Sequence, residues 1–135
     1  MRAWMCLAPL MLAACAGGDQ PARLTEKQAA RLEAALEGKV PGEPLKCVSR
    51  FSGSSLTAIS EGVLLYRVSG HLVYRNDLNG SCTGLGRGDT LIIRPTGAGS
   101  QYCRGDIVRS ADLVTGSITG GCALGSFTPY RTPGR

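Results

Sequence analysis

Four cysteines in the larger, C-terminal part of this chain restrict its fold more than any other feature. They stand at positions 47, 82, 103 and 122 of 135 residues, in a stretch rich in Gly, Ser and Thr, while Cys6 and Cys15 lie near the N-terminus. In a small exported chain, an even set of cysteines predicts a disulfide framework. We therefore expect a small domain held together by two disulfides.

A metal site is the alternative use of the same four cysteines. Zinc sites built on cysteine contain closely spaced pairs such as C-x-x-C. No two of these four cysteines have that spacing, and His71 is the single histidine of the sequence. We therefore predict no metal and no other cofactor.

The pairing of the four cysteines is open at this point, because four cysteines can pair in three ways and their spacing does not choose among them. We favour Cys82 with Cys103, which would join the two ends of one segment of strand and turns. Cys47 would then pair with Cys122 and tie the first strand to the last loop. In the chain-entropy model, each such loop contributes on the order of 3 kcal/mol.

The N-terminus has the pattern of a targeting segment. Arg2 supplies a positive charge, and residues 3–14 are almost wholly apolar before the chain turns polar at residues 17–20. A transmembrane helix needs about 20 apolar residues. The shorter run here, which Pro9 interrupts, has the length of a signal-peptide hydrophobic region. We expect residues 1–14 to be a signal peptide, so that Cys6 is removed with it.

Leu12-Ala13-Ala14-Cys15 resembles the lipobox of bacterial lipoproteins, in which a Leu stands three positions before an obligatory Cys. The resemblance implies that Cys15 becomes the acylated N-terminus and anchors the protein in the cell envelope by several acyl chains. Several chains anchor a protein stably, whereas a single chain binds the membrane only marginally. Ala16 stands where an Asp would resemble an inner-membrane retention signal, so we favour the periplasmic face of the outer membrane. Ordinary cleavage after Ala14 or Ala16 is the alternative, and it would give a periplasmic or secreted protein.

Residues 15–38 are predicted to be a lipidated tether with one short helix. Thr25 and Gln28 form a capping-box pattern, and Gly38 stands where a helix stop belongs. Three apolar residues fall on one narrow face: Ala29, Leu32 and Leu36. We expect the helix to pack lightly on the domain or to act as a spacer, with binding of a partner helix as a further alternative.

Residues 39–135 are predicted to form one small β domain. Hydrophobic residues there alternate with period two, as is typical of strands. Six segments have this pattern: 47–51, 63–68, 71–75, 90–94, 107–109 and 113–118. Ser69-Gly70 joins two of them as a two-residue hairpin loop. The expected fold class is mainly β: a small antiparallel β-sheet or barrel-like domain with disulfides, preceded by one short helix.

Four short segments follow Cys47 in a recognisable order: YRNDL at 74–78, CTGLG at 82–86, CRGDI at 103–107 and CALGSFTP at 122–129. This four-cysteine frame looks like a group of small secreted proteins of alphaproteobacteria whose function is uncharacterised. The resemblance spans residues 44–130. It implies a disulfide-bonded exported domain with no known catalysis.

The positive charge of the chain belongs to its β domain. Residues 39–135 carry eleven Lys or Arg against six Asp or Glu. Arginine binds phosphate and carboxylate through its planar fork, and the envelope offers lipid headgroups, lipopolysaccharide phosphates and peptidoglycan carboxylates. The candidate anion-binding residues are Arg67, Arg75, Arg87, Arg94 and Arg104. The basic residues are not interleaved with stacking aromatics, so we expect no nucleic acid partner. An envelope protein as partner, or a purely structural role, is the alternative.

Catalysis is the remaining function class. His71 lies just past the predicted hairpin turn, and no G-x-S-x-G stretch is present to position a serine nucleophile. A carboxylate-dependent hydrolase would need two of Asp77, Asp89, Asp106 and Asp112 to meet. All four lie at strand ends, where Asp commonly caps turns. We expect a structural or binding module with no catalytic residue, and the hydrolase is the alternative.

Overall fold

The computed structural model describes residues 23–97 and 99–134. The predicted signal peptide and the lipidation site at Cys15 lie outside the described residues. Within them, no helix is both long enough and apolar enough to cross a membrane.

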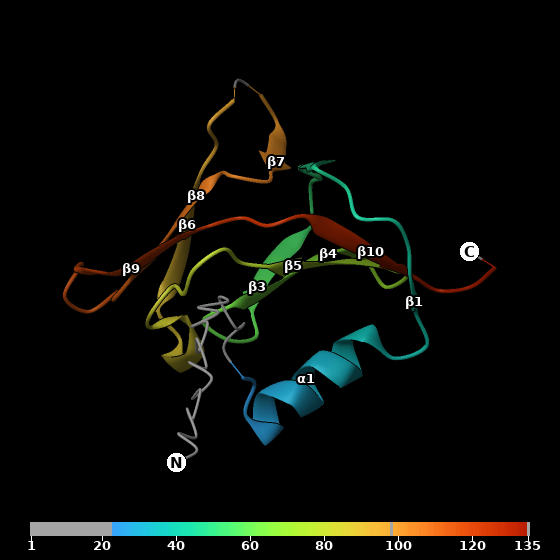
Figure 1. Ribbon diagram of the computed structural model, residues 1–135, viewed down its shortest axis with the longest axis horizontal. Helices are drawn as coiled ribbons and strands as arrows, with labels where there is room; N and C mark the ends of the chain where they lie inside the picture. Colours follow the sequence, from blue (N-terminus) through green and yellow to red (C-terminus); the bar gives the residue numbers. More distant parts are fainter. Residues whose placement is uncertain (1–22, 98, 135) are drawn as a thin grey trace, which may run out of the picture.

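One helix precedes ten short strands along the chain (Figure 1). The elements are α1 (Glu26–Leu36), β1 (Val40–Pro41), β2 (Cys47–Ser49), β3 (Ser55–Ala58), β4 (Val63–Ser69), β5 (Leu72–Asp77), the 3-10 helix η1 (Leu85–Arg87), β6 (Thr90–Arg94), β7 (Gln101–Cys103), β8 (Ile107–Ala111), β9 (Ile118–Ala123) and β10 (Phe127–Arg131). The expected mainly β fold with one short N-terminal helix is confirmed.

The strands form three antiparallel sheets. The largest has the order β1-β10-β5-β4-β3, a second joins β2 to β7, and the third has the order β6-β8-β9. The sheets of the described chain stay open and form no closed barrel. Two edge strands, β3 and β6, therefore keep one side free of a strand partner in their own sheets.

The β4–β5 hairpin is the centre of the largest sheet. It is the hairpin that the sequence predicts, with Tyr66 opposite Tyr74 and a register irregularity between Arg67 and Ser69. Side chains alternate across a strand, and both faces of β4 are covered. Leu64 and Tyr66 pack into the main core, whereas Leu65 packs toward α1.

Helix α1 begins at a capping box and packs on the largest sheet. The Thr25 hydroxyl accepts a hydrogen bond from Gln28 N at 3.2 Å, and the Gln28 side chain accepts one from Thr25 N at 3.0 Å. Leu32 is the buried residue of the helix and joins a cluster with Leu65 and Val73. Of the roles considered for this helix, the structure shows packing on the domain rather than a free spacer.

The predicted strand at residues 113–118 is wrong. Only its last residue, Ile118, lies in a strand, and residues 112–117 form the turn between β8 and β9. The Asp112 side chain accepts a hydrogen bond from Val114 N at 2.8 Å, which is the usual Asp turn geometry. The adjacent apolar residues Leu113 and Val114 favour a strand in the sequence, but both side chains are exposed.

The favoured cysteine pairing is also wrong. The disulfides join Cys47 to Cys103 and Cys82 to Cys122. In the β2–β7 pair, Cys47 stands directly opposite Cys103, so the register of two strands far apart in sequence determines the bond. The order of cysteines along the chain carries no information about that register.

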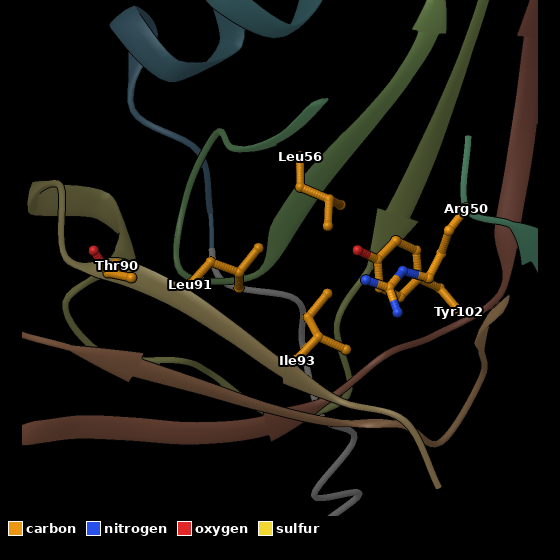
Figure 2. Close-up of a pocket in the computed structure, with 6 residues that line it drawn as sticks. All are labelled: Arg50, Leu56, Thr90, Leu91, Ile93 and Tyr102. Carbon is orange, nitrogen blue, oxygen red and sulfur yellow. The ribbon is translucent and has the colours of Figure 1, made fainter. Parts of the chain in front are cut away.

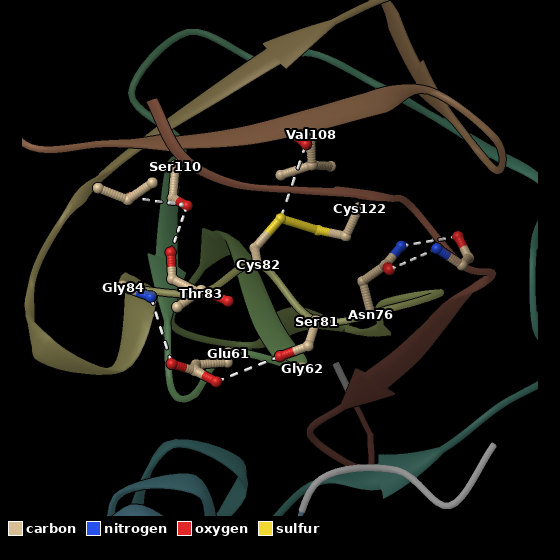
Figure 3. The surroundings of a disulfide bond; sticks show 12 residues. Glu61, Gly62, Asn76, Ser81, Cys82, Thr83, Gly84, Val108, Ser110 and Cys122 are labelled. Atoms are coloured by element: carbon tan, nitrogen blue, oxygen red, sulfur yellow. Dashed lines mark hydrogen bonds between the residues drawn. A yellow bond between two sulfur atoms is a disulfide. The ribbon is translucent and has the colours of Figure 1, made fainter. Parts of the chain in front are cut away.

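The second disulfide anchors the glycine-rich loop before β6 (Figure 3). Cys82 is fully buried, and the Glu61 carboxylate accepts hydrogen bonds from Gly84 N and Ser81 Oγ, both at 3.2 Å. Gly84 has φ +96°, in the left-handed region that favours glycine. This loop is a tight structural connection fixed by a disulfide and a carboxylate.

Candidate ligand pocket

An open pocket of about 300 Å³ lies where the edge strands β3 and β6 approach the β2–β7 pair. It is lined by Arg50, Leu56, Thr90, Leu91, Ile93 and Tyr102. Figure 2 shows Arg50 and Tyr102 at one end, Thr90 at the other, and Leu91 and Ile93 between them. The pocket therefore has a cationic end, an apolar middle and a hydroxyl at the far end.

The apolar part of the pocket is continuous with the main core. Leu91 and Ile93 stand two residues apart on β6 and so share one face of that strand. Both residues, with Leu56 of β3, are partly buried and pack against the central cluster. A ligand in the pocket would meet an apolar wall that the fold already maintains.

Arg50 supplies the charge at one end of the pocket. Its guanidinium carbon lies 5.1 Å from the centroid of the Tyr102 ring, which is within the range of a cation–π contact. The ion pairs among the described residues are Arg75–Asp77 and Arg87–Asp89. Arg50 has no carboxylate partner there, so its hydrogen-bond donors are open to an anion from solution.

Tyr66 fixes the backbone on both sides of Arg50. Its hydroxyl donates to Ser49 O at 3.0 Å and accepts from Phe51 N at 2.9 Å. The Tyr66 ring is only 1% exposed and meets Tyr102 edge to face, with the centroids 5.6 Å apart. Arg50 N also donates to Ser100 O at 2.8 Å. The backbone of Arg50 is thus held in place before any ligand binds, which lowers the entropic cost of binding.

The Cys47–Cys103 disulfide supports the same end of the pocket. Cys103 adjoins Tyr102 in β7, and Cys47 lies three residues before Arg50. Because Cys47 pairs with Cys103, Val48 comes to stand opposite Tyr102. The disulfide therefore covalently joins the two segments that carry the cation and the aromatic ring.

None of the five arginines predicted to bind anions lines this pocket. They are spread over different elements: Arg67 on β4, Arg75 on β5, Arg87 on η1, Arg94 at the end of β6 and Arg104 in the turn after β7. Strand alternation puts Arg67 and Arg75 on the face of the largest sheet that α1 covers, whereas Arg94 belongs to the three-stranded sheet. The five do not share one surface.

Two of these five arginines are already paired with carboxylates. Arg75 lies 3.0 Å from Asp77; burial lowers the pKa of Arg75, but the hydrogen bond and charge of Asp77 outweigh it and raise the pKa. Arg87 lies 3.1 Å from Asp89, whose hydrogen bond and charge raise the pKa of Arg87. Carboxylates of the same chain therefore partly neutralise both guanidinium charges.

Arg67 lines a second cavity, of about 280 Å³, between α1 and the edge of the largest sheet. Arg31 of the helix stands on the same cavity, and the other lining residues are Ala34, Ala35, Thr57, Ile59 and Leu65. The backbones of Arg31 and Arg67 are held by α1 and by the largest sheet, but no contact with an aromatic ring positions either guanidinium among the described residues, as Tyr102 positions that of Arg50. The Arg50 pocket is therefore the better-organised site.

Sequence reasoning missed Arg50 because it placed this residue inside a strand at 47–51. In the structure β2 ends at Ser49, and Arg50 lies in the segment that follows. The signal that could have found it is the disulfide pairing: once Cys47 is paired with Cys103, Tyr102 and Arg50 must lie near each other. No local motif marks the site.

The four aspartates of the hydrolase alternative each have hydrogen-bond partners of their own. Asp77 pairs with Arg75, and Asp112 accepts a hydrogen bond in its own turn. Asp89 accepts hydrogen bonds from Thr119 and Arg87. Both lower the pKa of Asp89, and the bond from Thr119 has the larger effect.

Asp106 is 1% exposed and closes the turn between β7 and β8. Its carboxylate accepts hydrogen bonds from Thr96 N and Thr96 Oγ1, both at 2.9 Å, and from Cys103 N at 2.8 Å. Burial raises the pKa of Asp106, but these hydrogen bonds outweigh it and hold the pKa below its ordinary value. The partners of Asp106 are those of a structural carboxylate.

The described residues contain no group of three or more His, Cys, Asp or Glu side chains that could hold a metal ion. Comparison with protein-family models, with curated proteins and with solved structures finds no match to this chain. The two disulfides indicate an extracytoplasmic domain, because such bonds persist in oxidising compartments.

Proposed function

We propose that this chain is a binding module of the bacterial cell envelope, anchored through a lipidated Cys15. Its pocket takes an anionic group that carries a short apolar segment. The observation that carries the proposal is Arg50, held by its backbone at the rim of an apolar pocket with no carboxylate partner among the described residues. The lipobox-like Leu12-Ala13-Ala14-Cys15 supports the anchor.

The chemistry of the pocket defines the ligand class. A guanidinium donates paired hydrogen bonds to phosphate or carboxylate, and the wall formed by Leu56, Leu91 and Ile93 suits a few methylene groups. A volume of about 300 Å³ is at the small end for ligand sites. It accommodates the terminal part of an envelope lipid or polymer rather than a whole one.

Octyl phosphate is the probe for the pocket, with octyl glucoside as the uncharged control, each used below the concentration at which it forms micelles. We expect octyl phosphate to bind in calorimetric titration and Arg50→Gln to weaken it about 10- to 100-fold, since hydrogen bonds to charged groups contribute about 1.5–3 kcal/mol. Arg104→Gln, an exposed arginine outside the pocket, is the matched control and should leave binding unchanged. Equal affinities of the Arg50→Gln and parent proteins would exclude this site.

The anchor is tested separately by intact mass measurement of the protein purified from an envelope fraction. We expect a triacylated N-terminal Cys15 and four oxidised cysteines, and loss of membrane retention in Cys15→Ala. An unmodified Cys15 would contradict the anchor while leaving the pocket result valid.

The partners of the aspartates do not favour the hydrolase alternative. The four carboxylates each accept hydrogen bonds from other residues, and no hydrogen bond joins two of them among the described residues: Asp77, Asp89, Asp106 and Asp112.

A further inference from the structure

The turn between β8 and β9 presents two adjacent apolar side chains to solvent. Leu113 is 78% exposed and Val114 is 94% exposed. The turn is closed by hydrogen bonds from Asp112 N to Ser117 O at 2.9 Å and from Gly116 N to Asp112 O at 2.8 Å. In Figure 1 this hairpin forms the far left end of the molecule, opposite the end that carries β1. An ordered, protruding turn thus carries the most exposed large apolar side chains of the described chain.

The outer face of the adjoining three-stranded sheet combines apolar and basic side chains. Ile92 of β6 stands opposite Arg109 of β8, and Arg94 stands opposite Ile107. Directly opposite residues share a face of an antiparallel sheet, and all four are exposed. The positions of β9 opposite Ile107 and Arg109 are Ala123 and Gly121, so β9 adds no bulk or charge there. No acidic residue occupies these paired positions.

We propose that this surface, formed by the β8–β9 turn and the outer face of β6 and β8, lies on an anionic lipid bilayer. Leu113 and Val114 enter the headgroup region, while Arg94 and Arg109 bind lipid phosphates. Contiguous exposed apolar side chains mark interaction sites. The paired positions of the sheet face carry Arg109, nearer the turn, and Arg94, at the far end of β6, with no acidic side chain, so this face complements an anionic bilayer in charge. The one carboxylate of the turn, Asp112, accepts a hydrogen bond from Val114 N. The proposal depends neither on the Arg50 pocket nor on Cys15.

The test places a fluorescent reporter at the tip of the full chain. Val114→Trp substitutes a residue that is almost fully exposed, so the new ring meets no packed neighbour. Val40→Trp, on β1 at the opposite end and 54% exposed, is the matched control. Both proteins are reconstituted with vesicles of equal parts phosphatidylglycerol and phosphatidylcholine whose acyl chains carry bromine as a quencher. Trp4, the single tryptophan of the sequence, lies in the predicted signal peptide, and any tryptophan signal of the parent protein is subtracted. Mass analysis confirms both disulfides in each variant.

We expect bromine to quench Val114→Trp and to leave Val40→Trp unquenched. Arg94→Gln with Arg109→Gln should lower the ratio of inserted to free tips about 25-fold, since each basic residue near an anionic surface contributes about fivefold. Added salt should act in the same direction. An unquenched Val114→Trp, or equal quenching at both positions, overturns the proposal. A concentration-dependent blue shift without quenching also overturns it, because a second copy of the chain would then cover this face.

Discussion

Replacing Tyr66 with Phe tests whether one hydroxyl organises the pocket. The substitution keeps the buried ring and its contacts with Tyr74 and Tyr102, but it removes the partner of both Ser49 O and Phe51 N. Each hydrogen bond contributes about 1 kcal/mol net, and partly buried groups left without a partner cost more. We expect the free energy of unfolding to fall by about 2 kcal/mol. The Arg50 segment should also loosen, so that octyl phosphate binds several-fold more weakly.

Urea unfolding with both disulfides intact measures this effect. At a slope of about 1–3 kcal/mol per molar urea, a loss of about 2 kcal/mol moves the midpoint by roughly 1 M. Tyr74→Phe is the matched control, because Tyr74 is a neighbouring core tyrosine whose hydroxyl has no hydrogen-bond partner among the described residues. Its change should stay below about 0.5 kcal/mol. If Tyr66→Phe changes stability no more than Tyr74→Phe, the hydroxyl does not hold the Arg50 segment and the argument for a pre-organised pocket fails.

Three further substitutions test the scaffold. Because folding lowers the pKa of Asp106, its carboxylate stabilises the folded protein fully above the unfolded pKa of about 3.9, and this contribution is lost as the pH falls through the folded pKa. Asp106→Asn should therefore make the free energy of unfolding depend less on pH in acid. A side chain at Gly125 would collide with the backbone oxygen of Asp77, so Gly125→Ala should cost about 1–3 kcal/mol in urea unfolding, whereas Gly97→Ala, which meets nothing within 4 Å, should cost little. Thr25→Ala removes the helix cap and should cost about 1 kcal/mol, and an unchanged urea midpoint would show that this cap contributes nothing to global stability.

Local structure was predictable from local residues. The capping box at Thr25 places the start of α1 correctly, and Ser69-Gly70 places the β4–β5 hairpin. In both cases the determining interactions span a few positions, so the sequence contains them directly. Strand patterns were less reliable. They missed β1, β3, β7 and β10, and they predicted a strand at the exposed residues Leu113 and Val114.

The disulfide pairing and the pocket were not predictable, because both depend on how distant strands pair. β2 and β7 are separated by most of the domain, and their register brings Cys47 opposite Cys103. Arg50 then meets Tyr102 as a consequence of that register. Charge counting indicated arginine as the candidate anion ligand but could not indicate which arginine lies over an aromatic ring without a carboxylate partner among the described residues.

The proposed anchor determines how high an affinity the pocket needs for its ligand. A single arginine beside a small apolar wall is expected to bind a free amphiphilic anion only weakly, since few contacts are available to offset the entropy of association. A protein tethered to the membrane meets lipid-borne ligands at an effective concentration in the millimolar range for a short flexible tether. Weak intrinsic affinity then suffices for occupancy, and selectivity comes from the charge of Arg50 rather than from a large interface. The anchored protein should therefore retain a lipid-borne anion under conditions in which Cys15→Ala loses it, although both proteins bind octyl phosphate in solution with the same affinity.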